Sequence, residues 1–194
     1  MSNLLKAKVG LKHKTIIYIW ITLVILGILF YLSYPTSFSP INISNFLKRF
    51  DSYMIIIYII LCLLRGFTLI PGTPFVVTGA ILFPTHPFLM LFISVSCMLF
   101  SSIILYFFSE FLGFDNFFQN KYPEKIEVIK NKLDGAKGVF FIALWAAFPL
   151  APTDLVCYVA GVIRLNLKIL LLGIFFGELP ICAFYIFTYK LITL

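Results

Sequence analysis

The chain has 194 residues, of which 61% are hydrophobic and only 12% are charged, and its mean hydropathy is +1.04. Soluble domains carry roughly twice that charged fraction, and a soluble domain of this size has too little interior for so much apolar surface. These values exclude a soluble globular protein and indicate an integral membrane protein. The net charge of +7 comes largely from lysines in polar segments. Such charges steer insertion and contact anionic headgroups, so no nucleic-acid partner is expected.

The chain begins with a basic tail and an apolar anchor. Residues 1–14 carry four lysines and precede an apolar run, residues 15–32, that is long enough to cross a membrane. No small-residue cleavage site follows this run, so we expect a retained anchor helix rather than a signal peptide. Residues 33–51 are polar and contain prolines and serines, which predicts a loop. The next apolar run, residues 52–66, is short for a membrane crossing and leads directly into a broken segment.

Two apolar segments, residues 67–87 and 138–165, are interrupted by prolines. The first contains LIPGTPFVVTGAIL and the second PLAPTDLVCYVAGVI, so that prolines come first and a glycine follows in both. A backbone group without a hydrogen bond costs ~2–7 kcal/mol in an apolar medium, and broken backbone is tolerated at membrane depth only where protein or a watery cavity surrounds it. We therefore predict two re-entrant hairpins. The hairpin-forming residues are expected to be Pro71, Gly72, Pro74 and Gly79 in the first, and Pro149, Pro152 and Gly161 in the second.

Two uninterrupted apolar runs, residues 88–112 and 167–193, complete the predicted spans. The predicted fold is an all-α integral membrane protein with about four transmembrane helices plus two re-entrant broken-helix hairpins in an inverted repeat, a recurring transporter plan. Residues 15–194 are expected to form a single membrane domain, with a core at residues 50–193.

The polar segment 113–137 has charges at helical spacing, which predicts an amphipathic surface helix from about residue 120 to 134. If the N-terminus is cytoplasmic and every predicted span crosses, this segment lies on the side opposite the basic tail. It carries five lysines and the tail carries four. The excess of positive charge on cytoplasmic loops therefore does not decide the orientation.

Three charged residues, Arg65, Asp154 and Glu178, lie inside apolar runs. A charge at the bilayer centre costs ~2.5–3.5 kcal/mol on insertion scales, so such residues usually pair or face water. Arg65 can pair with either Asp154 or Glu178. The cluster is then either a polar site, for a charged headgroup or a proton relay, or a salt bridge that only fixes the hairpins. Arg164 and Glu110 are expected to reach the interface, although Arg164 is also a candidate for attracting a phosphate.

Gly173 and Gly177 have the G-x-x-x-G spacing that allows close helix packing. We expect them to let a hairpin approach the last span beside Glu178. The chain has no catalytic triad, nucleotide-binding motif or C-x-x-C pair, so no enzyme activity, metal or cofactor is expected.

The stretches LRGFTLIPGTPFVVTGAILF and WAAFPLAPTDLVCYVAGVIRLN, followed by GELP, resemble the DedA family. This family is also described as the VTT-domain or SNARE-associated Golgi protein family, and the resemblance covers roughly residues 50–190. It implies two facing re-entrant hairpins and the movement of lipids between leaflets. Bacterial members are implicated in recycling polyprenyl-phosphate carriers and in proton-dependent envelope maintenance, and eukaryotic relatives in phospholipid scrambling.

The sequence departs from the transport-type bacterial pattern of that family. The pattern has an acidic residue in the first hairpin, where this chain has Pro-Gly-Thr-Pro. It also has two arginines around the second hairpin's prolines, where this chain has Ala146 and Pro152. In this respect the chain more closely resembles the eukaryotic-like branch, in which Pro-x-x-Pro occupies the second hairpin.

The expected function is translocation of a phospholipid or polyprenyl phosphate between leaflets by a scramblase or flippase. Membrane lipids are the expected partners, with anionic phospholipid or polyprenyl phosphate as candidates, and a homo-oligomer is left open. The expected location is a multi-pass position in the membrane, which is the plasma (inner) membrane if the source is bacterial. The alternatives are a proton-coupled small-solute transporter, with Glu178 and Asp154 as titrating groups, and a non-transporting scaffold or assembly factor.

Overall fold

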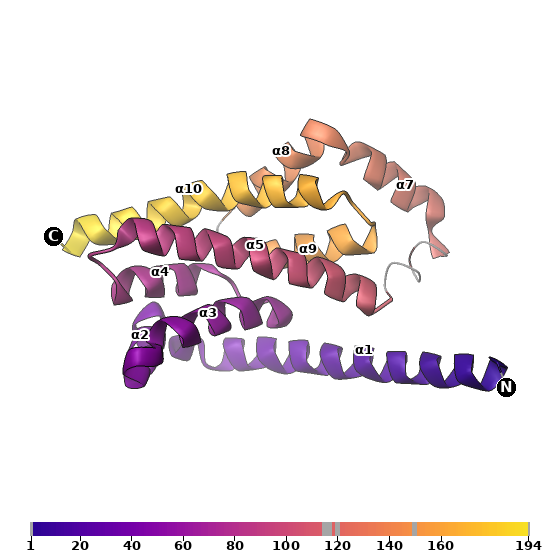
Figure 1. Ribbon diagram of the computed structural model, residues 1–194, viewed down its shortest axis with the longest axis horizontal. Helices are drawn as coiled ribbons and strands as arrows, with labels where there is room; N and C mark the ends of the chain where they lie inside the picture. The colour runs from indigo at the N-terminus through magenta and orange to yellow at the C-terminus, as the bar shows by residue number, and fades with distance from the viewer. Residues whose placement is uncertain (1, 114–117, 119–120, 149–150, 194) are drawn as a thin grey trace.

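The computed structural model describes residues 2–113, 118, 121–148 and 151–193, with the backbone alone for 2–14 and 193. The regular structure in these ranges is entirely helical, as predicted (Figure 1). Four stretches are long and apolar enough to cross a membrane, namely Thr15–Ser33, Pro40–Thr68, Pro87–Phe111 and Leu167–Ile192. The elements are α1 (Ser2–Ser33), η1 (Pro35–Phe38), α2 (Pro40–Leu47), η2 (Lys48–Tyr53), α3 (Met54–Leu64), η3 (Arg65–Thr68), α4 (Thr73–Leu82), α5 (Pro87–Phe111), α7 (Pro123–Lys132), α8 (Gly135–Ala146), α9 (Thr153–Val162) and α10 (Leu167–Thr193), where η marks a 3₁₀ helix.

The long helices α5 and α10 form the centre of the molecule and run antiparallel (Figure 1). With 25 and 27 residues, they are about 37–40 Å long, enough to cross the hydrocarbon core of about 30 Å. Helix α1 lies along one side and is mostly exposed. Its Trp20 ring packs against Tyr158, with ring centroids 5.2 Å apart, and so attaches α1 to α9.

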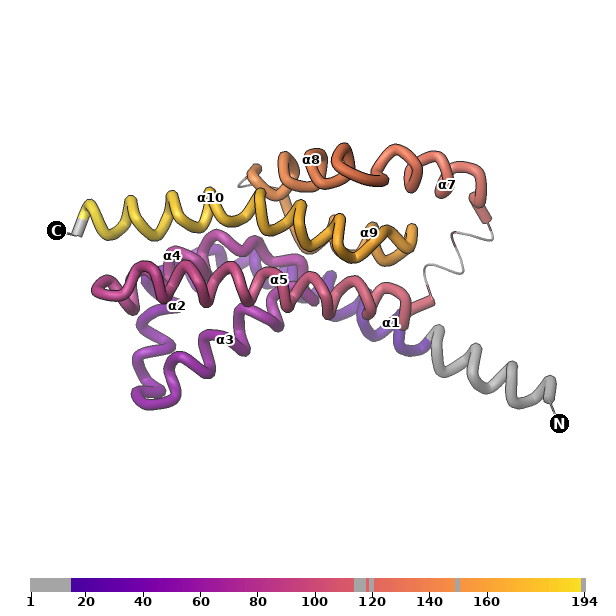
Figure 2. Tube along the Cα trace, turned by 45° about the horizontal axis from the view of Figure 1, so that its top comes forward, coloured from indigo at the N-terminus to yellow at the C-terminus, as the bar shows by residue number. Residues whose placement is uncertain are grey.

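The remaining core helices make two similar units, α3–α4–α5 and α8–α9–α10. In each unit a short helix runs to the middle of the molecule, the chain breaks, and a second short helix returns to the same end before the long helix begins (Figures 1 and 2). The short helices have 10 to 12 residues and are about 15–18 Å long, roughly half the hydrocarbon thickness.

Packing between the units is reciprocal. Helix α4 packs against α10, and α9 packs against α5, so the long helix of each unit covers the returning helix of the other. Because α5 and α10 are antiparallel, the units are inverted relative to each other (Figure 1). That the short helices re-enter a membrane stays a prediction.

The loop predicted for residues 33–51 is wrong, since most of this segment is helical. Ser39 caps α2 by accepting a hydrogen bond from the Asn42 amide at 3.3 Å, and Pro40 occupies the first helical turn, where a proline costs no hydrogen bond. Helix α2 then packs against α4, where the Thr78 hydroxyl donates to the Pro40 carbonyl at 3.2 Å. The serine and proline mark a helix start rather than a loop.

Residues 52–66 lie within the candidate span Pro40–Thr68, as predicted, but the boundary between this span and the hairpin predicted at residues 67–87 differs from the prediction. Helix α3 is the first limb of that hairpin; it ends at Leu64, and the chain then turns through η3 and through Leu69, which has a left-handed φ of 58°. Because α3 starts and α4 ends at the same end of the molecule, the starts of α1 and α7 both lie toward the other end (Figure 1). The sequence placed these two basic segments on opposite sides.

Two of the predicted hairpin-forming glycines have a different role. Helices α4 and α9 begin at Thr73 and Thr153, so Gly79 and Gly161 lie inside them near their ends. A Cβ at Gly79 would be 2.7 Å from the Tyr58 hydroxyl oxygen, so it is a close-packing position. The residues at the breaks themselves are Pro71, Gly72 and Pro152; Pro74 lies in the first turn of α4, and Pro149 lies outside the described residues.

Candidate functional site

The two breaks meet at a small cavity in the middle of the molecule. Residues 71–73 of the first break and 151–154 of the second line it, together with Arg65 and Glu178. Its volume is about 20 Å³, room for a single water-sized group. The arrangement shelters the broken backbone of each unit against the other unit.

Arg65, in the turn after α3, is the cation of this cavity. Its side chain is 3% exposed, and its Nη1 lies 2.8 Å from Oδ2 of Asp154, whose side chain is 7% exposed. Nη1 also donates to the Ile70 carbonyl at 3.4 Å, so the guanidinium binds a carbonyl that the break leaves out of any helix. Nη2 contacts the sulfur of Met98 on α5. Among the described residues, Arg65–Asp154 is the one ion pair, and Arg65 Nε is buried without a hydrogen-bond partner.

Two glycines make room for this guanidinium. A Cβ at Gly72 would lie 2.9 Å from Arg65 Cζ, and a Cβ at Gly66 would lie 3.2 Å from Asp154 Oδ1 and 2.6 Å from Ser101 Oγ. Contacts below 3.0 Å require a neighbouring group to shift. The glycines therefore let the guanidinium lie against the first break and let the turn after α3 approach both α5 and α9.

Glu178 contributes a second carboxylate from the middle of α10. It is 6% exposed and lines the same cavity, but its partners are uncharged. Oε1 accepts a hydrogen bond from the Thr153 hydroxyl at 2.7 Å, and Oε2 accepts one from the Cys182 thiol at 3.9 Å. The sequence left two possible partners for Arg65, and in the structure Arg65 pairs with Asp154 rather than with Glu178. The cluster holds one cation and two carboxyl groups, so it is negative by one charge unless one carboxyl group carries a proton.

Helix α8 lies on α10 next to Glu178, at the glycines of the G-x-x-x-G pair. A Cβ at Gly173 would lie 2.6 Å from Ile142 Cβ, and one at Gly177 would lie 2.5 Å from the Ala143 carbonyl oxygen. The contact between these two helices is the most extensive in the fold. It fixes the second break relative to Glu178.

Arg164 does not join the cluster. It is exposed, has a left-handed φ of 50°, and follows the end of α9. It lines a separate surface hollow together with Lys130 and Asp134. Among the residues predicted for a polar transport site, the structure therefore brings together Arg65, Asp154 and Glu178 and leaves Arg164 apart.

Sequence reasoning missed the residues that orient the carboxyl groups and the guanidinium. Thr153 binds Glu178, and the sequence could have indicated this residue, because it is a polar residue next to Asp154 in an otherwise apolar run. Met98 and Cys182 had no such signal, since both read as ordinary apolar packing residues. Within the described ranges, no group of three His, Cys, Asp or Glu side chains is arranged to bind a metal ion.

A comparison with protein families shows which family the chain belongs to. A family model of the VTT domain matches residues 70–191, well over half of the sequence. The chain belongs to the VTT-domain family, the DedA/SNARE-associated Golgi protein family. It is therefore an integral membrane protein of that family. Comparisons with curated proteins and with solved structures found no match. The matched region contains both breaks, Asp154 and Glu178, whereas Arg65 lies before it.

Proposed function

We propose that this VTT-domain protein moves lipids between leaflets, as a scramblase or flippase of phospholipid or polyprenyl-phosphate type. The observation that carries the proposal is the Arg65–Asp154 ion pair, buried where two broken helices meet. A buried charge and a broken backbone are each costly in a membrane, and a packed apolar core would avoid both. Their coincidence at the middle of the molecule, in a family linked to lipid movement, supports a path for a charged headgroup.

The chemistry of the pair suits a phosphate. A guanidinium binds phosphate through two parallel hydrogen bonds, and an entering phosphate headgroup can replace Asp154 as the partner of Arg65. Exchange of one anion for another keeps the buried cation paired while the acyl chains stay in the lipid. The displaced Asp154 carboxyl group then needs a proton or water, which the separation of the breaks supplies in this proposal. The cavity of about 20 Å³ is too small for a headgroup, so the proposal requires the two breaks to separate during passage.

Reconstitution in liposomes tests this function. One arm contains a fluorescent phospholipid and the other a labelled polyprenyl phosphate, and a membrane-impermeant quencher measures exchange between leaflets. We expect faster exchange than in empty vesicles in at least one arm, and at least a tenfold loss in Arg65→Gln. Lys48→Gln, which removes an exposed cation from η2, is the matched control and is expected to keep the wild-type rate.

A double variant separates folding from transport. Arg65→Gln/Asp154→Asn removes both charges and keeps the shape of the pair, so it is expected to fold and to lose exchange. Wild-type exchange in this double variant contradicts the proposed role of the ion pair. Wild-type exchange no faster than that of empty vesicles, in both arms, rules out lipid translocation.

Glu178 favours a second candidate, a proton-coupled small-solute transporter. Its carboxyl group is buried in the cavity, binds the Thr153 hydroxyl and has no ion pair among the described residues. Such a group can take up and release a proton as a transport cycle proceeds. Proton flux into vesicles under an imposed pH gradient tests this candidate, and Glu178→Gln is expected to abolish the flux. An equal flux in wild type and Glu178→Gln argues against it.

A further inference from the structure

A surface groove lies at the elbow between α7 and α8, outside the central cavity. Val128 and Lys132 on α7 and Lys137, Phe140 and Phe141 on α8 line it, and its volume is about 960 Å³. We call it the elbow groove. The groove is a wide hollow that is open to its surroundings, unlike the small central cavity.

The floor of the elbow groove is apolar and accessible. Phe140 and Phe141 are 63% and 56% exposed, and their ring centroids lie 6.0 Å apart. Val128 on α7 is 52% exposed and faces the same groove. Two exposed aromatic rings beside an exposed valine present a continuous apolar surface of the kind that an acyl chain covers.

The rim of the elbow groove is positively charged. Lys132 and Lys137 are both exposed, and neither forms an ion pair with any residue that the structure describes. A neighbouring hollow shares Asn131 with the groove and adds Lys130, which Asp134 partly offsets. The apolar floor and the cationic rim of the elbow groove are together complementary to an amphiphile with a negatively charged head group.

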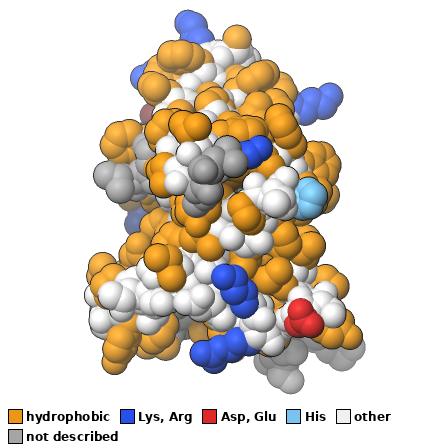
Figure 3. Space-filling view, turned by 90° about the vertical axis from the view of Figure 1, so that its left-hand side faces the viewer, with side chains coloured by type: hydrophobic (Ala, Val, Ile, Leu, Met, Phe, Trp, Pro, Cys, Tyr) orange, Lys and Arg blue, Asp and Glu red, His pale blue; other side chains and the backbone are white. Residues whose placement is uncertain are grey.

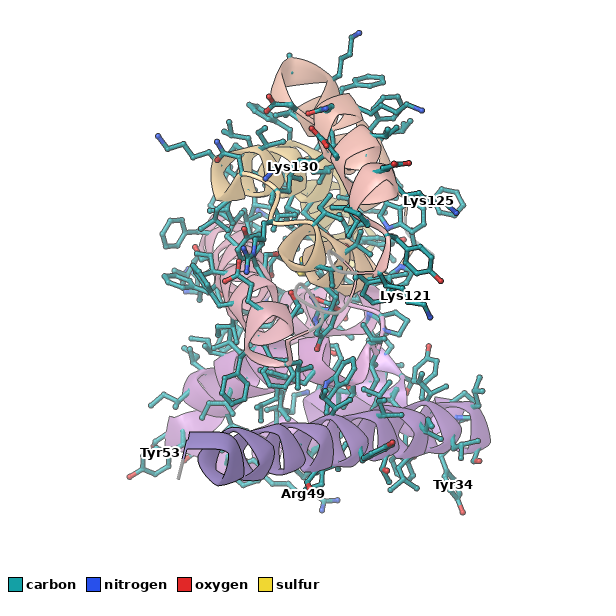
Figure 4. The ribbon with its side chains drawn as sticks, turned by 90° about the vertical axis from the view of Figure 1, so that its right-hand side faces the viewer. Tyr34, Arg49, Tyr53, Lys121, Lys125 and Lys130 are labelled. Carbon is teal, nitrogen blue, oxygen red and sulfur yellow. The ribbon has the colours of Figure 1, made fainter. Side chains whose placement is uncertain are left out.

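The position of the groove identifies the source of that amphiphile. The elbow lies on the half of the molecule where α5 ends and α10 begins, and α7 leads from it toward the end at which α1 starts (Figure 1). The four lysines of residues 1–14 belong to the first turns of α1. Figure 4, which views the molecule from this end, shows Lys121, Lys125 and Lys130 on or beside α7, whereas Arg49 belongs to η2 at the opposite end. Lysine-rich segments concentrate on the cytoplasmic side of membrane proteins, where the leaflet carries anionic lipids.

We propose that the elbow groove binds an anionic membrane lipid. The phosphate headgroup lies between Lys132 and Lys137, and one acyl chain lies along Phe140 and Phe141. The site is distinct from the Arg65 cluster and does not depend on translocation, so the lipid anchors the α7–α8 elbow at the membrane surface whatever the protein transports.

Lipid titration of the purified full chain tests the site. The protein in neutral detergent is titrated with phosphatidylglycerol and, separately, with phosphatidylcholine, and native mass spectrometry counts the bound lipid. We expect tighter binding of phosphatidylglycerol. Lys132→Gln/Lys137→Gln is expected to weaken that binding about 30-fold, which corresponds to about 1 kcal/mol for each charge, and to leave phosphatidylcholine unchanged. The matched control Lys48→Gln/Arg49→Gln removes two cations from η2 and is expected to bind both lipids as wild type does.

Two further arms test the apolar part of the site. Phe140→Ser/Phe141→Ser is expected to weaken binding of both lipids, and soluble glycerol phosphate is expected not to displace phosphatidylglycerol, because it has no acyl chain. Wild-type affinity in the double lysine variant overturns the proposal, as does an equal loss in the η2 control. Displacement by glycerol phosphate at equal concentration shows a simple anion site and also overturns it.

Discussion

The two units of the fold share one arrangement of helices but carry opposite buried charges. The unit α3–α4–α5 has Arg65 at its break and no acidic residue before Glu110, near the end of α5. The unit α8–α9–α10 has Asp154 at its break and Glu178 in its long helix. The buried ion pair joins the units, because Arg65 of the first unit pairs with Asp154 of the second. The difference shows that the two units are complementary, and that each depends on the other for its charge balance.

The units also differ in how closely their glycine helices approach their neighbours. A Cβ at Gly161 of α9 would lie 1.9 Å from Ser109 Oγ and 2.4 Å from the Tyr106 carbonyl oxygen, both on α5. The nearest atom to a Cβ at Gly79 of α4 is the Tyr58 hydroxyl oxygen, 2.7 Å away on α3 of the same unit. Gly161 therefore lies in the contact between the units, whereas Gly79 lies inside its own unit, and the contact of α9 with α5 is more extensive than that of α4 with α10. Figure 3 views the molecule from the end that is on the left in Figure 1, and hydrophobic side chains make up most of the surface seen there.

The largest expected effect comes from breaking the charge complementarity. Asp154→Leu breaks the buried ion pair and leaves Glu178, which binds Thr153, as the remaining carboxyl group of the cavity. The loss of the pair should lower the free energy of unfolding by up to about 3–5 kcal/mol. Arg65→Met/Asp154→Leu removes both charges and should recover most of that loss. Denaturant titration of the purified protein in detergent measures both. Equal stability of Asp154→Leu and wild type would show that the units do not depend on each other for charge balance.

A smaller effect is expected at the two packing glycines. Gly161→Ala should cost about 1–3 kcal/mol, because the added methyl group meets a backbone carbonyl that cannot move aside. Gly79→Ala should cost less, because its neighbour is a side-chain hydroxyl, and Tyr58→Phe in the same chain should relieve it. Denaturant titration of the single variants and of Gly79→Ala/Tyr58→Phe measures the difference. A greater loss at Gly79 than at Gly161 would reverse the comparison between the units.

The smallest effect is expected at the second arginine that the sequence singled out. Arg164→Gln should change the free energy of unfolding by no more than about 0.5 kcal/mol, because Arg164 is exposed and does not line the central cavity. Leaflet exchange in liposomes should also stay at the wild-type rate, in contrast with Arg65→Gln. A loss of exchange comparable to that of Arg65→Gln would place Arg164 on the lipid path.

The sequence predicted the breaks better than it predicted the helices that flank them. Proline and glycine act on the backbone locally, so Pro71, Gly72 and Pro152 mark the interruptions without any knowledge of the neighbours. The end of α3 at Leu64 had no comparable signal, because residues 52–66 are apolar whether the helix crosses the membrane or stops halfway. For that reason we predicted α3 as a separate membrane span, and we placed the basic segments 1–14 and 113–137 on opposite sides of the membrane.

By itself, the sequence determined the membrane class, the helical fold and membership of the VTT-domain family. Hydropathy and helical periodicity are sums over neighbouring residues, so a single chain is enough to read them. The tertiary structure alone decided that Arg65 pairs with Asp154, 89 residues away, while Glu178 binds Thr153, and that α3 ends beside the second break. Those outcomes depend on which helices pack together, because the choice of partner for a buried charge follows from three-dimensional distance rather than from local composition.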